Sequence, residues 1–273
     1  MDGELAQAIA LVAYGNVYLN QRPPGPAPEL WNANSTFRYV GSVRFPYTGL
    51  EGKEIEDSNR TSDWLEKLRS RGAKRLWLEV SPDLIGLPEY VAATFANTGK
   101  RTITVDFQNS CDTWVQRWSR GSFDKSWTVS YHGTRSQKLK VQHVDLETAS
   151  KGLIADIKKA RGFTVAALNR ADVSQQTRDY FGNYVKDLDE ALRLADSPDP
   201  SISYYPDMLP LNYGLAAKQT SAAAAKAWLF GGMGAWTDLP ANVEGIQKEF
   251  DRLAGDFYNS VIRALVTAAN SPL

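Results

Sequence analysis

Apolar and polar residues alternate along several stretches of the first half of the chain, the pattern of half-buried β-strands. In the first of these, Phe37, Tyr39, Val43 and Phe45 alternate with more polar neighbours. The pattern predicts five strands, at residues 36–45, 75–80, 102–107, 126–131 and 138–146. The last two are separated by a short polar link that contains Gly133, so we expect them to form an antiparallel hairpin.

Apolar residues spaced three or four positions apart predict helices. In the first half they indicate an opening helix at 4–14, short helices near Trp64 and at 90–96, and a helical face carrying Trp114 and Trp118. After Asp145 helical patterns dominate, with stripes at 153–160, 180–195, 221–230 and 246–265.

Together these elements predict an α+β fold. Residues 1–146 are expected to form a mixed sheet of about five strands with flanking helices, and residues 147–273 a helical bundle. No flexible linker separates the halves near residue 147, so they form either two domains or one continuous domain.

The stretch from Ser221 to Pro240 combines an alanine-rich helix with a glycine cluster between two tryptophans. Gly231 and Gly232 can adopt the positive φ angle that commonly ends a helix. A phosphate loop needs another glycine spacing, and glycines at the end of a helix meet the negative pole of its dipole. We therefore expect a structural turn packed against a core.

Composition limits the classes of function. The 31 basic residues balance 31 acidic ones, which disfavours a general attraction to nucleic acid or to an anionic membrane. No apolar run is long enough to span a bilayer, and the acidic start does not fit a secretory signal. The single cysteine cannot form an intramolecular disulfide. These features predict a soluble cytoplasmic protein without a cofactor.

The best catalytic constellation in the sequence is Cys111 with His132, His143 and Asp145. Cys111 would be the nucleophile of a cysteine–histidine hydrolase, activated at the start of a helix that carries Trp114. One histidine would act as the base, oriented by Asp145 or by Asp112. The two histidines with Asp145 could also hold a metal ion, but three ligands would have to converge, so no metal is expected.

A second candidate is a basic and aromatic stretch between residues 114 and 143. Tryptophan and arginine are typical anchors of protein interfaces. The candidate partner-binding residues are Trp114, Arg117, Trp118, Arg120, Trp127 and Arg135. Alternatively, the tryptophans face the core and the cations lie in solvent. Stacking of nucleic-acid bases is disfavoured by the neutral charge of the whole chain.

No motif indicates a known family. The expected function is binding of a macromolecule, most simply another protein, with an inhibitor or immunity-type role as one form of it. This expectation leans away from an enzyme. The hydrolase with Cys111 and either His132 or His143 is the alternative.

Overall fold

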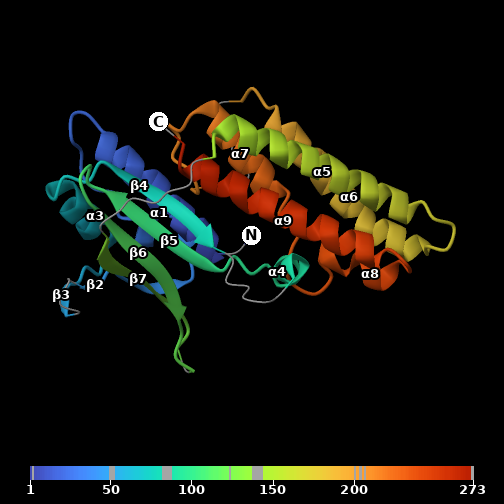
Figure 1. The fold of residues 1–273 in the computed structure, drawn as a ribbon, viewed down its shortest axis with the longest axis horizontal. Helices are drawn as coiled ribbons and strands as arrows, with labels where there is room; N and C mark the ends of the chain where they lie inside the picture. The colour runs from blue at the N-terminus through green and yellow to red at the C-terminus, as the bar shows by residue number, and fades with distance from the viewer. Residues whose placement is uncertain are drawn as a thin grey trace.

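The computed structural model describes residues 1, 3–48, 53–81, 88–122, 124–136, 144–199, 201–202, 205 and 207–271. Figure 1 shows a sheet with its helices, formed by the first half of the chain, beside an elongated group of helices formed by the second half. The predicted α+β class is confirmed, with a mixed sheet and flanking helices in the first half and a helical second half.

The sheet contains both parallel and antiparallel pairs. Its strands are β1 (Val40–Arg44), β2 (Tyr47–Thr48), β3 (Glu54–Glu56), β4 (Arg75–Ser81), β5 (Lys100–Asp106), β6 (Cys111–Ser119) and β7 (Trp127–Ser136). The order is β3-β2-β7-β6-β5-β4, and β1 also pairs with β7. Strands β4 to β7 form an antiparallel meander, whereas β1 and β2 run parallel to β7. Strand β4 therefore lies at one edge of the sheet.

The helix expected around Trp114 and Trp118 is wrong, because these residues belong to β6. Side chains four residues apart share one face of a strand as well as of a helix, so their spacing alone did not distinguish the two structures. The neighbouring Thr113 and Val115 favour the strand. Residues 138–143 of the last expected strand lie outside the described residues, and Leu146 begins a helix instead.

The helices of the first half are α1 (Gly3–Asn20), α2 (Leu30–Ala33), the 3₁₀ turn η1 (Ser35–Phe37), α3 (Thr61–Ser70) and α4 (Glu89–Phe95). Helices α1 and α3 cover one face of the sheet, which we call the inner face. Aromatic rings fill the space beneath them: Phe45 stacks on Trp64 and on Tyr131, with ring centroids 4.7 and 5.2 Å apart. Trp114 packs edge-on against Trp64 at 5.4 Å. Buried aromatic side chains dominate the packing energy of such a core.

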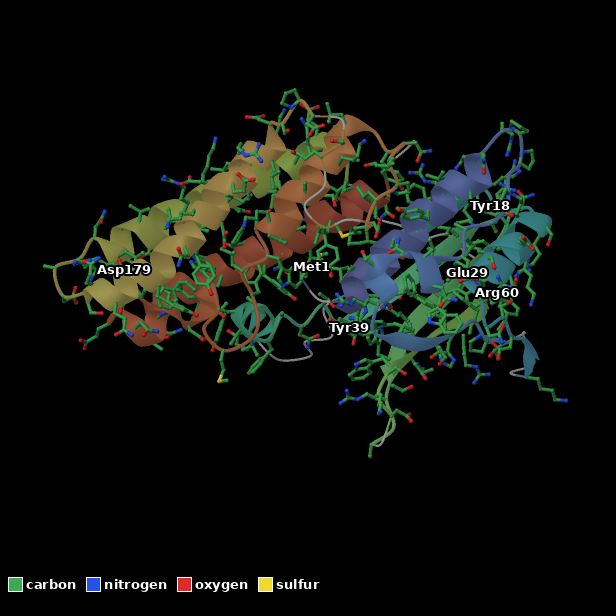
Figure 2. All side chains as sticks on the ribbon, turned by 180° about the vertical axis from the view of Figure 1, so that it is seen from behind. Met1, Tyr18, Glu29, Tyr39, Arg60 and Asp179 are labelled. Carbon is green, nitrogen blue, oxygen red and sulfur yellow. The ribbon has the colours of Figure 1, made fainter. Side chains whose placement is uncertain are left out.

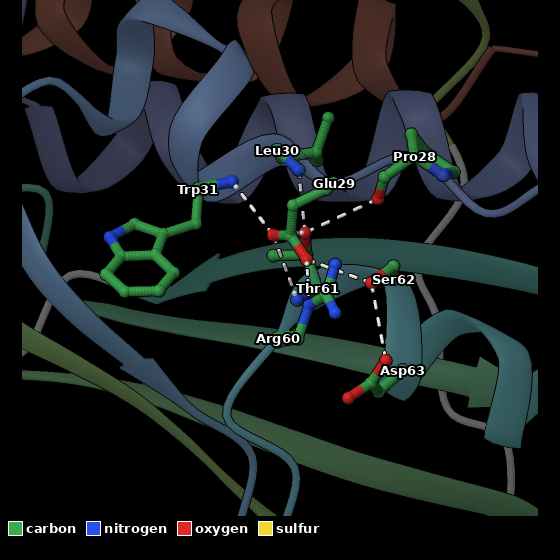
Figure 3. Close-up of polar contacts among 8 residues, drawn as sticks. All are labelled: Pro28, Glu29, Leu30, Trp31, Arg60, Thr61, Ser62 and Asp63. Atoms are coloured by element: carbon green, nitrogen blue, oxygen red, sulfur yellow. Dashed lines mark hydrogen bonds and ion pairs between the residues drawn. The ribbon is translucent and has the colours of Figure 1, made fainter.

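Glu29 joins the starts of two helices (Figure 3). Its Oε1 accepts hydrogen bonds from the N–H of Trp31 in α2 and from the N–H and hydroxyl of Thr61 in α3, at 3.3, 3.3 and 2.6 Å. Its Oε2 accepts from Ser62 at 2.9 Å and from Arg60 at 3.2 Å. Burial alone would raise the pKa of Glu29, but these hydrogen bonds outweigh it and lower the pKa.

Two asparagines pair with the outer edge of β4. Asn16 of α1 accepts from the N–H of Leu76 at 2.8 Å and donates to its carbonyl at 3.0 Å. Asn270, just after the last helix, does the same at Leu78, with both distances 2.8 Å. Each side-chain amide thus replaces the hydrogen bonds of a neighbouring strand. This arrangement occupies backbone groups of the edge strand that could otherwise pair with another chain, and it attaches α1 and the last helix to the sheet.

The second half contains α5 (Leu146–Leu168), α6 (Gln175–Ala195), α7 (Leu215–Lys226), the 3₁₀ turn η2 (Trp236–Asp238), α8 (Leu239–Asn242) and α9 (Gln247–Ala269). Helices α5, α6, α7 and α9 lie side by side in Figure 1. One hydrophobic cluster extends from Leu5 and Ile9 of α1 through Ile103 of β5 to Phe257 and Leu265 of α9. The apolar side chains of both halves are therefore in contact. Within the described part of the chain, no helix is long and apolar enough to cross a membrane.

The glycine cluster forms a turn, as expected, but away from the end of the helix. Helix α7 ends at Lys226, and Gly231, Gly232 and Gly234 follow with φ angles of 78°, 86° and 79°. Trp236 is fully buried and donates from its indole N–H to the hydroxyl of Thr164 at 2.8 Å. Met233, in the same turn, is fully exposed.

Candidate functional site

Cys111 and His132 lie on neighbouring strands of the sheet. Cys111 is the first residue of β6, is 1% exposed, and its thiol contacts the carbonyl oxygen of Ser136 at 3.7 Å. His132 lies in β7, where its Nε2 is 2.9 Å from the hydroxyl oxygen of Ser130. The thiol is thus at the start of a strand and not at the start of a helix, whose dipole would have favoured the thiolate.

The register of β6 and β7 separates the two residues. Cys111 is opposite Ser136, whereas His132 is opposite Val115. A strand rises about 3.3 Å per residue, so four residues along β7 place His132 about 13 Å from the position opposite Cys111. Hydrogen-bond reach is about 3 Å, so the structure does not bring this cysteine and this histidine together. His143 lies outside the described residues.

The two aspartates considered as orienting groups have structural contacts. Asp112 is fully buried on the inner face, where Arg71 donates to it at 2.5 Å and Tyr47 donates at 3.3 Å. Asp145 caps the start of α5 by accepting from the N–H of Thr148 at 2.9 Å. In the described part of the chain, no hydrogen bond joins either carboxylate to the thiol of Cys111. Among the residues that the structure describes, no three histidine, cysteine, aspartate or glutamate side chains are grouped to hold a metal ion.

The six residues of the basic and aromatic stretch occupy different places. Trp114 is 3% exposed and belongs to the aromatic core, so it is unsuited to contact a partner, contrary to the prediction. By strand alternation, Arg117 lies on the face of the sheet opposite to Trp114 and Trp118. Arg135 is near the other end of β7, where it donates to Ser110 at 3.0 Å. The remaining three residues, Trp118, Arg120 and Trp127, are close to one another.

Trp118, Arg120 and Trp127 gather where β6 passes into β7. The two indole rings are 5.6 Å apart, and the Arg120 guanidinium lies 4.8 Å from the centroid of the Trp127 ring. Both tryptophans are half-buried, and Arg120 is exposed. The connection between these strands is the green loop that projects at the bottom of the sheet in Figure 1. A cation positioned over the face of an indole ring is attracted to it by a cation–π interaction.

Tyr39 and Arg38 extend this group from another part of the chain. The N–H of Trp127 donates to the carbonyl of Tyr39 at 3.1 Å, which places the start of β1 beside the start of β7. Tyr39, labelled in Figure 2, is 71% exposed, and the Arg38 guanidinium lies 5.6 Å from its ring centroid. We call Arg38, Tyr39, Trp118, Arg120 and Trp127 the hairpin-end surface.

Sequence reasoning missed Arg38 and Tyr39 because they are about 80 positions from Arg120. The sequence indicates this position only weakly, because alternation predicts a strand at Tyr39, whereas β1 begins at Val40. An aromatic residue between an arginine and the true strand start is a candidate for the surface, but only the parallel pairing of β1 with β7 brings it to Trp127.

The charge of the hairpin-end surface is positive. Arg38 and Arg120 belong to it, and the exposed Lys125 follows in the same connection. Asp124 is the nearest described acid along this connection, and one of its carboxylate oxygens accepts from the N–H of Gly121 at 3.1 Å. The surface therefore presents cations and aromatic rings together.

Comparisons with known proteins give no family for this chain. No protein-family model matches it, and neither a curated protein nor a solved structure matches it significantly.

Proposed function

We propose that the protein acts by binding a partner protein through the hairpin-end surface. The observation that carries this proposal is the stack of Arg120 over Trp127, which in turn contacts Trp118. Half-buried tryptophans beside arginine are the residue types that most often dominate binding energy at protein interfaces. Their rings keep few rotatable bonds, so little conformational entropy is lost when a partner covers them.

The chemistry of the surface favours an acidic partner with an apolar centre. Arg38, Arg120 and Lys125 would attract carboxylates, while Tyr39 and the tryptophans would bury against apolar side chains. An inhibitor or immunity-type role is one form that such binding can take. The neutral charge of the whole chain again favours a protein over nucleic acid, whose binding depends on many cations.

Site-specific photo-crosslinking tests this proposal. A benzophenone amino acid replaces Tyr39, and the protein is irradiated in cells of its source organism. We expect one dominant protein adduct, which the double variant Trp118→Ala, Arg120→Ala removes because the anchors of the interface are gone.

The matched control places the benzophenone at Tyr180, an exposed tyrosine of α6 in the helical half. It should give no adduct of the same mass. Identical adducts from both positions, or an adduct that survives the double variant, would contradict the proposal. An adduct that disappears on nuclease treatment would show that the partner is a nucleic acid and not a protein.

A further inference from the structure

A second feature of the molecule is a cleft of about 1000 Å³ between the two halves. The edge strand β4 forms its floor with Arg75, Trp77 and Glu79. Its walls come from the second half of the chain: the last turns of α9 and the first turns of α5 and α7. The volume is at the upper end of the range typical of small-molecule sites. The hairpin-end surface contributes no residue to it.

The first turn of α7 supplies hydrogen-bond donors to this cleft. Gly214, Ala216 and Ala217 line it, and no side chain in the described part of the chain caps the start of this 12-residue helix. The first N–H groups of a helix have no partner within the helix and carry the positive end of its dipole. Such a helix start favours an anionic group.

Thr267 is an independent sign of a ligand. It is 8% exposed and lines the cleft from α9, yet its hydroxyl makes no hydrogen bond with the residues that the structure describes. The hydroxyl is therefore available to bond with a group in the cleft that this residue lines. A polar ligand group in the cleft would supply that partner.

Arg263 supplies a countercharge from the same helix. It lines the cleft one turn before Thr267, is exposed, and forms no ion pair with the described part of the chain. Arg75 is committed elsewhere, because it donates to the carbonyl of Asn270 and stacks on Trp77, with its guanidinium 3.8 Å from the ring centroid. Arg263 is thus the cation of the cleft that remains available to a ligand.

Two acids also line the cleft and limit the charge of a ligand. Asp145 is engaged as the cap of α5. Burial raises the pKa of Glu79, and the hydrogen bond from Thr104 at 3.5 Å only partly opposes this. With two arginines against two carboxyl groups, a singly charged anion suits the cleft better than a phosphate dianion.

Apolar side chains also line the cleft. Val144, Leu146, Ile262 and Val266 line it together with Trp77. Side chains of this kind take an apolar or planar body and exclude water from the polar contacts.

We propose that the cleft binds a small carboxylic acid with an apolar, planar body. Its carboxylate faces the first turn of α7, Arg263 and Thr267, and its body lies against Trp77. This site is independent of the partner-binding role of the hairpin-end surface.

Calorimetric titration of the full chain with 2-naphthoate tests the proposal, with the neutral 2-naphthalenemethanol as the matched probe. We expect 2-naphthoate to bind about tenfold more tightly, the factor that one charge-assisted contact of about 1.4 kcal/mol provides. Arg263→Gln should abolish the difference between the probes. Arg252→Gln, a change at an exposed arginine of the same helix outside the cleft, should preserve it.

A second variant tests the helix start. Leu215→Pro places proline at the first position of α7, where its φ angle fits and only an unpaired N–H is lost, so the fold is preserved. It should weaken 2-naphthoate several-fold and leave the alcohol unchanged. Equal affinities of both probes for the unmodified protein would overturn the proposal, as would no binding at millimolar concentration or an unchanged preference in Arg263→Gln.

Discussion

Gly231 and Gly232 have almost the same backbone conformation but different surroundings. Both have positive φ, which strains any residue with a Cβ atom. A Cβ built on Gly231 would lie 2.7 Å from the Cβ of Ala96, whereas one on Gly232 meets no atom of the described residues within 4 Å. The loop after α7 thus presses against the end of α4 at one glycine and not at the next.

Alanine substitutions at these two glycines should therefore differ in their effect on the free energy of unfolding. Gly232→Ala should lower the free energy of unfolding by about 1–2 kcal/mol, the cost of the positive φ. Gly231→Ala should cost about 1–3 kcal/mol more, because the added methyl group overpacks against Ala96. Urea unfolding of both variants measures the two values. Equal losses would show that the contact with Ala96 does not constrain the loop.

At the scale of elements, one carboxylate holds the starts of α2 and α3. The pKa of Glu29 is lowered in the folded protein, so its ionised form stabilises the fold above the unfolded pKa, and that stability is lost as pH falls through the folded pKa. Glu29→Gln should cost about 1–2 kcal/mol at pH 7, in the range of hydrogen bonds to a charged group.

The difference between the unmodified protein and Glu29→Gln should then shrink as the pH falls from the ordinary glutamate pKa of 4.5 toward the lowered folded pKa, because Glu29 becomes protonated and, like Gln, uncharged. Urea unfolding at pH 7, 5 and 3.5 follows this change. Glu66→Gln, at an exposed site of α3, serves as the control and should change little at any pH. A pH-independent loss in Glu29→Gln would mean that the charge of Glu29 is unimportant.

Sequence patterns predicted some of these elements and not others. The alternating apolar positions around Leu76 and Ile103 correctly predicted β4 and β5, because these side chains are buried. Trp114 and Trp118 fit both periods, and only the pairing of β6 with β5 and β7 decides for the strand. Assembly of the hairpin-end surface likewise depends on the pairing of β1 with β7, which no local pattern encodes.

At the scale of the whole molecule, the two halves share one hydrophobic cluster and meet at the edge of β4. Asn270 makes two hydrogen bonds with Leu78 there, and the proposed ligand cleft exists only if the halves keep this arrangement. We infer that α1, the sheet and α9 fold as one cooperative unit.

Scanning calorimetry of Asn270→Ala tests this cooperativity. The variant leaves the buried N–H and carbonyl of Leu78 without partners at this edge, which should cost about 1–3 kcal/mol. If the molecule is one unit, a single transition should move to lower temperature as a whole, while Asn242→Ala at an exposed site of α8 leaves it in place. Two separate transitions, of which only one moves, would contradict the account.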